Sequence, residues 1–171
     1  TRMMTAFRNP ILGMAVGAIL TAIIQSSSAS VGILQALCST GAVHYAVALP
    51  IIMGQNIGTC VTAIISSLGA NRNARRSAMI HLYFNLIGTI VFMVVFYSLN
   101  RVLDFVFLDK AANAAGIALL HSLFNIGAII LLFPFADKLV KLAEITIPDG
   151  AKEPEAKKDS IIIDERFLDR P

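Results

Sequence analysis

Two polar motifs interrupt a long stretch of this chain that carries no charged side chain. Residues 9–71 contain no Asp, Glu, Lys or Arg, and the first motif within them is Gln25-Ser26-Ser27-Ser28. Hydroxyls donate to oxyanions and also coordinate hard cations such as Na⁺, and glutamine adds a carbonyl oxygen and two N–H donors. A helix that begins just after these serines would add its free N–H groups, which favour an anion. The cluster predicts an ion-binding site; the alternative is serines that pack a helix interface.

The second motif lies in residues 54–62. Gly54 and Gly58 allow unwinding and close backbone approach, and Asn56, Thr59 and Thr62 supply oxygens. Carbonyls freed by unwinding could coordinate Na⁺, while the following half-helix would face an anion. The alternative is a contact between helices through the two glycines.

Residues 78–85 and 118–125 resemble each other. Both segments place a histidine four residues before an asparagine, as His81 with Asn85 and His121 with Asn125, so each pair shares one helix face. We expect the two helices to pack these faces against one binding unit. The histidines either bond to an asparagine across the helices or act as ligands or proton relays.

No catalytic set is visible. A serine nucleophile needs a base and an orienting acid, and no carboxylate lies between Arg8 and Arg72. We therefore expect neither an enzyme nor a cofactor, and no metal other than sodium. The basic residues are not interleaved with aromatic ones, which argues against nucleic-acid binding.

The composition is that of an all-α polytopic membrane protein. The 171 residues are 56% hydrophobic and only 15% charged, whereas soluble domains are about 25% charged. The apolar segments before residue 69 are shorter than the ~20 residues that a spanning helix needs. We predict a re-entrant hairpin over residues 10–39 with its tip at residues 25–28, and a broken helix over residues 45–68, unwound near residues 54–58. The alternative is two kinked but ordinary spanning helices.

The next two apolar runs, residues 77–100 and 111–136, predict complete transmembrane helices. The loop at residues 69–76 holds three arginines and no acid, which places it in the cytoplasm. Two further crossings return the lysine-containing tail to the same side. The transmembrane transport domain then covers residues 1–136, and residues 137–171 are a cytoplasmic linker that leads to a further domain.

The two motifs, followed by His81, Phe84 and Asn85, resemble the type II sodium-dependent phosphate cotransporter family, in its bacterial branch. Residues 164–168 resemble the start of the PhoU-like domain that follows many bacterial members, here truncated. The resemblance implies a fold of two inverted repeats, of which this chain is similar to the second. It also implies that phosphate and Na⁺ bind where the motifs meet.

By this resemblance, phosphate binds at the two motifs, at Gln25, Ser26, Ser27, Ser28, Asn56 and Thr59. We assign sodium to an overlapping set, Gln25, Ser28, Asn56, Thr59 and Thr62. The expected function is sodium-coupled phosphate transport across the bacterial inner membrane, with this chain as the C-terminal half. The missing half is a first repeat of the same transporter or a second copy of the chain, with membrane lipid around both. The alternatives are a membrane-anchored regulatory scaffold without transport, or a sodium-coupled transporter of another anion.

Overall fold

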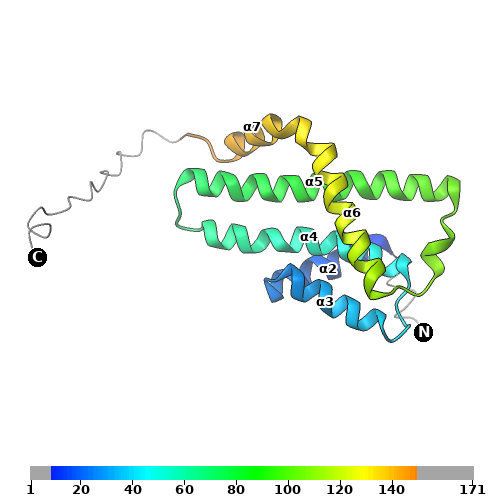
Figure 1. Cartoon of the computed structure of the whole chain (residues 1–171). Coiled ribbons are helices and arrows are strands. Elements are labelled where there is room, and N and C mark those ends of the chain that lie inside the picture. Colours follow the sequence, from blue (N-terminus) through cyan, green and yellow to red (C-terminus); the bar gives the residue numbers. More distant parts are fainter. Residues whose placement is uncertain (1–8, 150–171) are drawn as a thin grey trace, which may run out of the picture.

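The computed structural model describes residues 9–149, and this part of the chain is a stack of helices without strands. Helices α4 and α5 run antiparallel, the hairpin of α2 and α3 lies on one side of α4, and α6 crosses the pair before α7 turns back along α5 (Figure 1). The helices are α2 (Pro10–Ile24), α3 (Ser27–Cys38), α4 (Tyr45–Ser67), α5 (Arg72–Leu103), α6 (Ala114–Leu132) and α7 (Ala136–Thr146), with short 3₁₀ turns η1 (Val106–Asp109) and η2 (Phe133–Phe135).

The hairpin of α2 and α3 is divided at Gln25 and Ser26. Asn9 caps the start of α2, with Pro10 in its first turn, where a missing N–H costs nothing. Gln25 ends α2 in the left-handed conformation, at φ 57°, and Ser26 caps α3 by accepting a hydrogen bond from the Ala29 N–H. The break therefore lies within the predicted tip. Both helices are shorter than a spanning helix, and their re-entry into the membrane stays a prediction.

Helix α4 is continuous, so the predicted broken helix is wrong. It runs unbroken from Tyr45 to Ser67 through both glycines. Gly54 and Gly58 instead allow α2 to approach, because a Cβ atom at either position would overlap the main-chain oxygen of Met14 or Ala18. Glycines that let two helices pack this closely need no unwinding. The alternative of a helix contact through these residues is the one the structure adopts.

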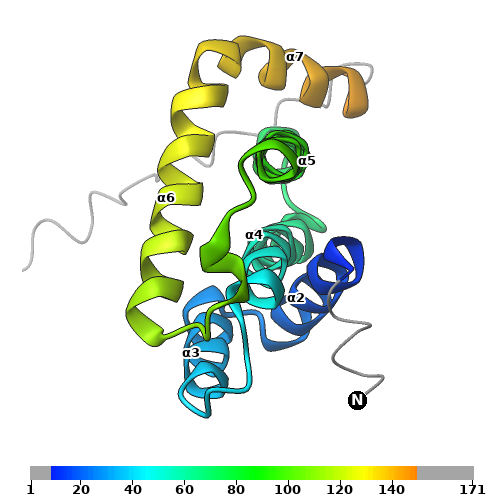
Figure 2. The same ribbon diagram turned by 90° about the vertical axis from the view of Figure 1, so that its right-hand side faces the viewer.

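Three described helical stretches are long and apolar enough to cross a membrane: α4, α5 and the stretch from Ala114 to Thr146. The first predicted transmembrane run, residues 77–100, lies inside α5. The second corresponds to α6, which begins at Ala114 and ends at Leu132. The helical stretch continues through η2, where Pro134 interrupts it, into α7, which turns sharply away from the direction of α6 (Figure 2). Figure 2, which looks along α4 and α5, shows α6 passing from the α3 side to α7.

The residues that follow α7 are bonded to the arginine loop. Arg76 donates to the main-chain carbonyl of Ile147 at 3.0 Å and pairs with Asp149 at 3.0 Å. The two basic segments that we assigned to the cytoplasm thus lie at the same end of the molecule. Residues 150–171, with the predicted linker and the segment similar to a PhoU-like domain, lie outside the described residues.

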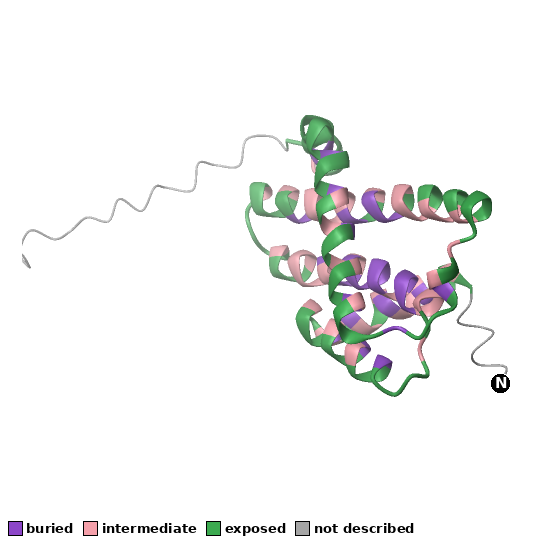
Figure 3. Ribbon diagram, turned by 45° about the vertical axis from the view of Figure 1, so that its right-hand side comes forward, coloured by how far each residue is buried: buried purple, intermediate pink, exposed green. Residues whose placement is uncertain are grey.

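The core of the described part is centred on α4. Figure 3 shows buried residues concentrated along this helix, while α6, α7 and the outer faces of α2 and α5 are mostly exposed. The exposed faces of α2 and α6 are apolar, as Ile23 (75% exposed) and Ile130 (71% exposed) illustrate, whereas α7 exposes charged residues such as Lys138 and Lys141. Apolar side chains on an outer surface suit contact with lipid or with another membrane helix.

Candidate functional site

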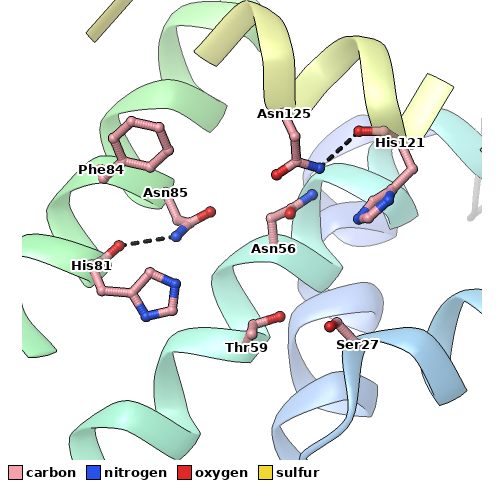
Figure 4. Close-up of a pocket in the computed structure, with 8 residues that line it drawn as sticks. All are labelled: Ser27, Asn56, Thr59, His81, Phe84, Asn85, His121 and Asn125. Atoms are coloured by element: carbon pink, nitrogen blue, oxygen red, sulfur yellow. Dashed lines mark hydrogen bonds between the residues drawn. The ribbon is translucent and has the colours of Figure 1, made fainter. Parts of the chain in front are cut away.

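One cavity of about 280 Å³ collects polar side chains from four helices. A single water occupies about 30 Å³ in the liquid, so the cavity has room for a small hydrated ion. Figure 4 shows the lining residues, which face one another across it. They are Ser27 of α3, Asn56 and Thr59 of α4, His81, Phe84 and Asn85 of α5, and His121 and Asn125 of α6.

Ser27 reaches the cavity because the chain turns sharply just before it. The left-handed Gln25 ends α2, and Ser26 starts α3, so that Ser27 is the first residue of the new helix. The first N–H groups of an α-helix have no partner within the helix and carry a partial positive charge. The start of α3 therefore brings a hydroxyl and hydrogen-bond donors to one side of the cavity.

A buried network holds α3 in this position. The Gln55 side chain of α4 donates from Nε2 to the main-chain carbonyl of Ser30 at 3.0 Å. The Thr21 hydroxyl of α2 donates to the Ser30 hydroxyl at 2.8 Å. All three residues are fully buried. The network joins α2, α3 and α4 one turn behind Ser27.

Helix α4 brings Asn56 and Thr59 to the cavity, roughly one turn apart. Asn56 donates from Nδ2 to the Ile52 carbonyl at 3.0 Å. The Thr59 hydroxyl donates to the Gln55 carbonyl at 2.9 Å. Both side chains donate a hydrogen bond to a main-chain carbonyl of α4, so their oxygens can still accept a hydrogen bond or coordinate a cation.

The repeated histidine–asparagine pairs lie on either side of this part of α4. Asn85 donates to the His81 carbonyl at 3.0 Å, and Asn125 donates to the His121 carbonyl at 2.7 Å. The two faces do pack against one unit, as the sequence repeat predicts. The expected imidazole–asparagine bond across the helices is not formed, since within residues 9–149 neither imidazole has a hydrogen-bond partner.

Of the predicted site residues, the cavity brings together Ser27, Asn56 and Thr59. Gln25 and Ser28 are exposed at the hairpin turn, and the Ser26 hydroxyl lies 3.3 Å from that of Ser28. These three residues are neighbours of Ser27 in the sequence, but their side chains do not line the cavity.

Thr62 also stays outside the lining, one turn beyond Thr59 on α4. Its hydroxyl is buried and has no hydrogen-bond partner within the described residues. A buried hydroxyl without a partner is unusual and costs about 1–3 kcal/mol.

Five lining residues were absent from the predicted site, namely His81, Phe84, Asn85, His121 and Asn125. All five lie in the repeated segments, residues 78–85 and 118–125, but a repeat alone does not show which helix faces meet. Among the described lining residues none is charged, so the cavity offers an ion only neutral donors and acceptors.

Helices long and apolar enough to cross a membrane, packed around an uncharged polar cavity, indicate a multi-pass membrane protein. The family model described as Na+/Pi-cotransporter matches residues 1–147. The chain belongs to this family.

Several proteins are similar to the chain over part of their length. YqeW of Bacillus subtilis, an uncharacterized protein, is 30% identical over 133 residues, which are 78% of this chain and 42% of YqeW. Sodium-dependent phosphate transport protein 2A of Rattus norvegicus is 40% identical over 91 residues, 50% of this chain and 14% of that protein. YjbB of Salmonella typhimurium, provisionally named an inorganic phosphate export protein, is 30% identical over 140 residues, 82% of this chain and 25% of YjbB.

The chain thus spans less than half the length of these relatives. No solved structure matches it.

Proposed function

We propose that this chain is one half, the C-terminal half, of a transporter that carries inorganic phosphate across the bacterial inner membrane together with Na⁺. The observation that carries the proposal is the shared cavity: Ser27 of the first motif and Asn56 and Thr59 of the second line the same space. Motifs so far apart in the chain meet there because α2 and α3 fold back onto α4.

Phosphate binds at the start of α3. Ser27 supplies a hydroxyl, and the first-turn N–H groups add donors with the positive end of the helix dipole. Gln25, Ser26 and Ser28 complete the phosphate side from the turn, together with Asn56 and Thr59 across the cavity. The exposed position of Gln25 and Ser28 lets these side chains approach a bound ion or a second half of the transporter.

Sodium binds among the oxygens of the two motifs. Asn56 and Thr59 present free oxygens to the cavity. Thr62 adds a buried hydroxyl that has no partner in the described structure. Gln25 and Ser28, in the turn between α2 and α3, supply the remaining oxygens. Oxygen is the ligand that hard cations prefer.

Coupling follows from the neutral lining. No described lining residue carries a positive charge that would neutralise phosphate, so bound Na⁺ has to supply it. Each ion then raises the affinity for the other, by the same factor in both directions.

The second half of the transporter is an equivalent repeat, either in the same polypeptide or in another copy of the chain. The relatives are much longer than this chain, which is compatible with two repeats. The exposed apolar faces of α2 and α3, with residues such as Ile19 (60% exposed) and Leu37 (52% exposed), offer a surface for it.

The test is a flux measurement on the complete polypeptide that the gene encodes, reconstituted in proteoliposomes. We expect ³²P-phosphate flux that falls when choline replaces Na⁺ on the side of entry. Equal flux in choline contradicts the coupling, and no flux in either medium favours the regulatory scaffold. Because YjbB is named for export, flux is measured with the Na⁺ gradient in both directions.

A further inference from the structure

We propose that the cavity recognises the proton of its oxyanion, so that it selects a phosphate with a P–OH group over oxyanions that have none. The inference rests on the proposed function and adds the discriminating residues. They are the three cavity asparagines, Asn56, Asn85 and Asn125, with the imidazoles of His81 and His121 beside them.

The orientation of the three amides is fixed by their partners. Each asparagine bonds to the main-chain carbonyl four residues earlier, at 3.0, 3.0 and 2.7 Å for Asn56, Asn85 and Asn125. A carbonyl can only accept, so the amide nitrogen has to face it, and Oδ1 points away. Within residues 9–149 no donor reaches any of the three Oδ1 atoms. Figure 4 shows Asn85 and Asn125 on two sides of the cavity, with Asn56 between them.

Thr59 adds a fourth acceptor of the same kind. Its proton is used in the bond to the Gln55 carbonyl, so its oxygen offers lone pairs to the cavity. The donors are grouped elsewhere, at Ser27 and the start of α3. Apart from the two imidazoles, the cavity therefore has a donor side at α3 and an acceptor side on α4, α5 and α6.

A bound oxyanion has to match both sides. HPO₄²⁻ accepts at three oxygens and donates from one hydroxyl, so it can face α3 with oxygens and an asparagine Oδ1 with its proton. Sulfate carries no proton at neutral pH. Its oxygens can only accept, so the lone pairs of a sulfate oxygen would face those of an asparagine Oδ1 atom. A neutral imidazole carries one donor and one acceptor, and with no other partner in the described structure, His81 and His121 can adapt to either arrangement.

The probe that isolates the proton is monofluorophosphate, because it has the charge and nearly the shape of HPO₄²⁻ with fluorine in place of the hydroxyl. Binding of ³²P-phosphate to the purified complete polypeptide in Na⁺ is competed with unlabelled phosphate, monofluorophosphate or sulfate. We expect the last two to compete at least about 10-fold more weakly, the effect of one lost hydrogen bond. Monofluorophosphate that competes as well as phosphate overturns the inference.

Asn125→Leu tests the residue assignment, since leucine keeps the size and removes the acceptor. We expect phosphate to bind about 10-fold more weakly, with monofluorophosphate unchanged or tighter, so that discrimination is lost. Ser122→Ala, an exposed change on the same helix, should leave both unchanged. If Asn125→Leu raises only the Na⁺ requirement and keeps the discrimination, the oxygen serves Na⁺ and the inference fails.

The outcomes separate this inference from the proposed function. Phosphate that binds with discrimination but is not transported contradicts the transport proposal and supports the inference. If phosphate is transported and monofluorophosphate binds as tightly as phosphate, the transport proposal is supported and the inference is contradicted. A protein that binds no phosphate overturns both. The wild-type comparison with monofluorophosphate remains decisive if Asn125→Leu fails to fold.

Discussion

Gln55 donates its side-chain N–H to the main-chain carbonyl of Ser30, at 3.0 Å between two fully buried residues. The bond joins α4 to the first turns of α3, directly behind Ser27. The other amide atom, Oε1, is buried without a partner in the described structure. Gln55 therefore holds the hairpin although its buried, unpartnered oxygen lowers the stability of the fold. We infer that its role is to position Ser27.

Gln55→Met should weaken phosphate binding with little change in stability. Methionine removes the bond to Ser30 and also the unpartnered oxygen, and the two effects on the free energy of unfolding, each about 1–3 kcal/mol or less, oppose each other. The measurement pairs ³²P-phosphate binding with thermal unfolding in detergent. Gln35→Met is the matched control, because Gln35 bonds to Ala114 at an exposed position. Equal loss of binding in both variants argues against positioning by Gln55.

Gly54→Ala should destabilise the pair of α2 and α4. The new Cβ would overlap the Met14 main-chain oxygen, and backbone cannot yield as a flexible side chain can, so we expect a loss of about 1–3 kcal/mol in the free energy of unfolding. Gly32→Ala on α3 is the control, since a Cβ there meets nothing within 4 Å. Alanine is the better helix former by about 0.5–1 kcal/mol, so Gly32→Ala should be neutral or stabilising. A Gly54→Ala protein as stable as the wild type would contradict the close packing.

Ser27→Ala should lower phosphate transport by about 10-fold while membrane insertion stays intact. It removes one hydroxyl from the donor side of the cavity, and a hydrogen bond to a charged group is worth about 1.5–3 kcal/mol. Gln25→Ala should have the same direction of effect. Ser39→Ala, at the opposite end of α3, serves as the control. Wild-type flux in both Ser27→Ala and Gln25→Ala would remove the first motif from the site.

Thr62→Val should raise the Na⁺ concentration needed for half-maximal flux. Valine keeps the shape of threonine and removes the buried, unpartnered hydroxyl, so stability should be unchanged or slightly higher. Thr21→Val is the matched comparison, because the Thr21 hydroxyl has a partner in Ser30. That variant should lose about 1–3 kcal/mol of stability. An unchanged Na⁺ requirement in Thr62→Val would exclude Thr62 as a sodium ligand.

The amino-acid sequence was sufficient for the class of protein and for the motifs. Long uncharged runs predict helices in a membrane wherever they stand in the chain, because the cost of burying charge in lipid depends on composition. The break at Gln25 and Ser26 was also predictable, since a polar cluster with a capping serine is local information. The family resemblance rested on the same local motifs and agrees with the family match.

The tertiary structure decided what the glycines and the repeated pairs do. Gly54 and Gly58 are equally compatible with unwinding and with close packing, and only the position of α2 against α4 selects packing. His81 and Asn85 share a face with each other by helix periodicity, but only the crossing of α5 and α6 over α4 places that face against His121 and Asn125. Local preference determines where helices begin and end, whereas the meeting of helix faces depends on contacts between residues far apart in the chain.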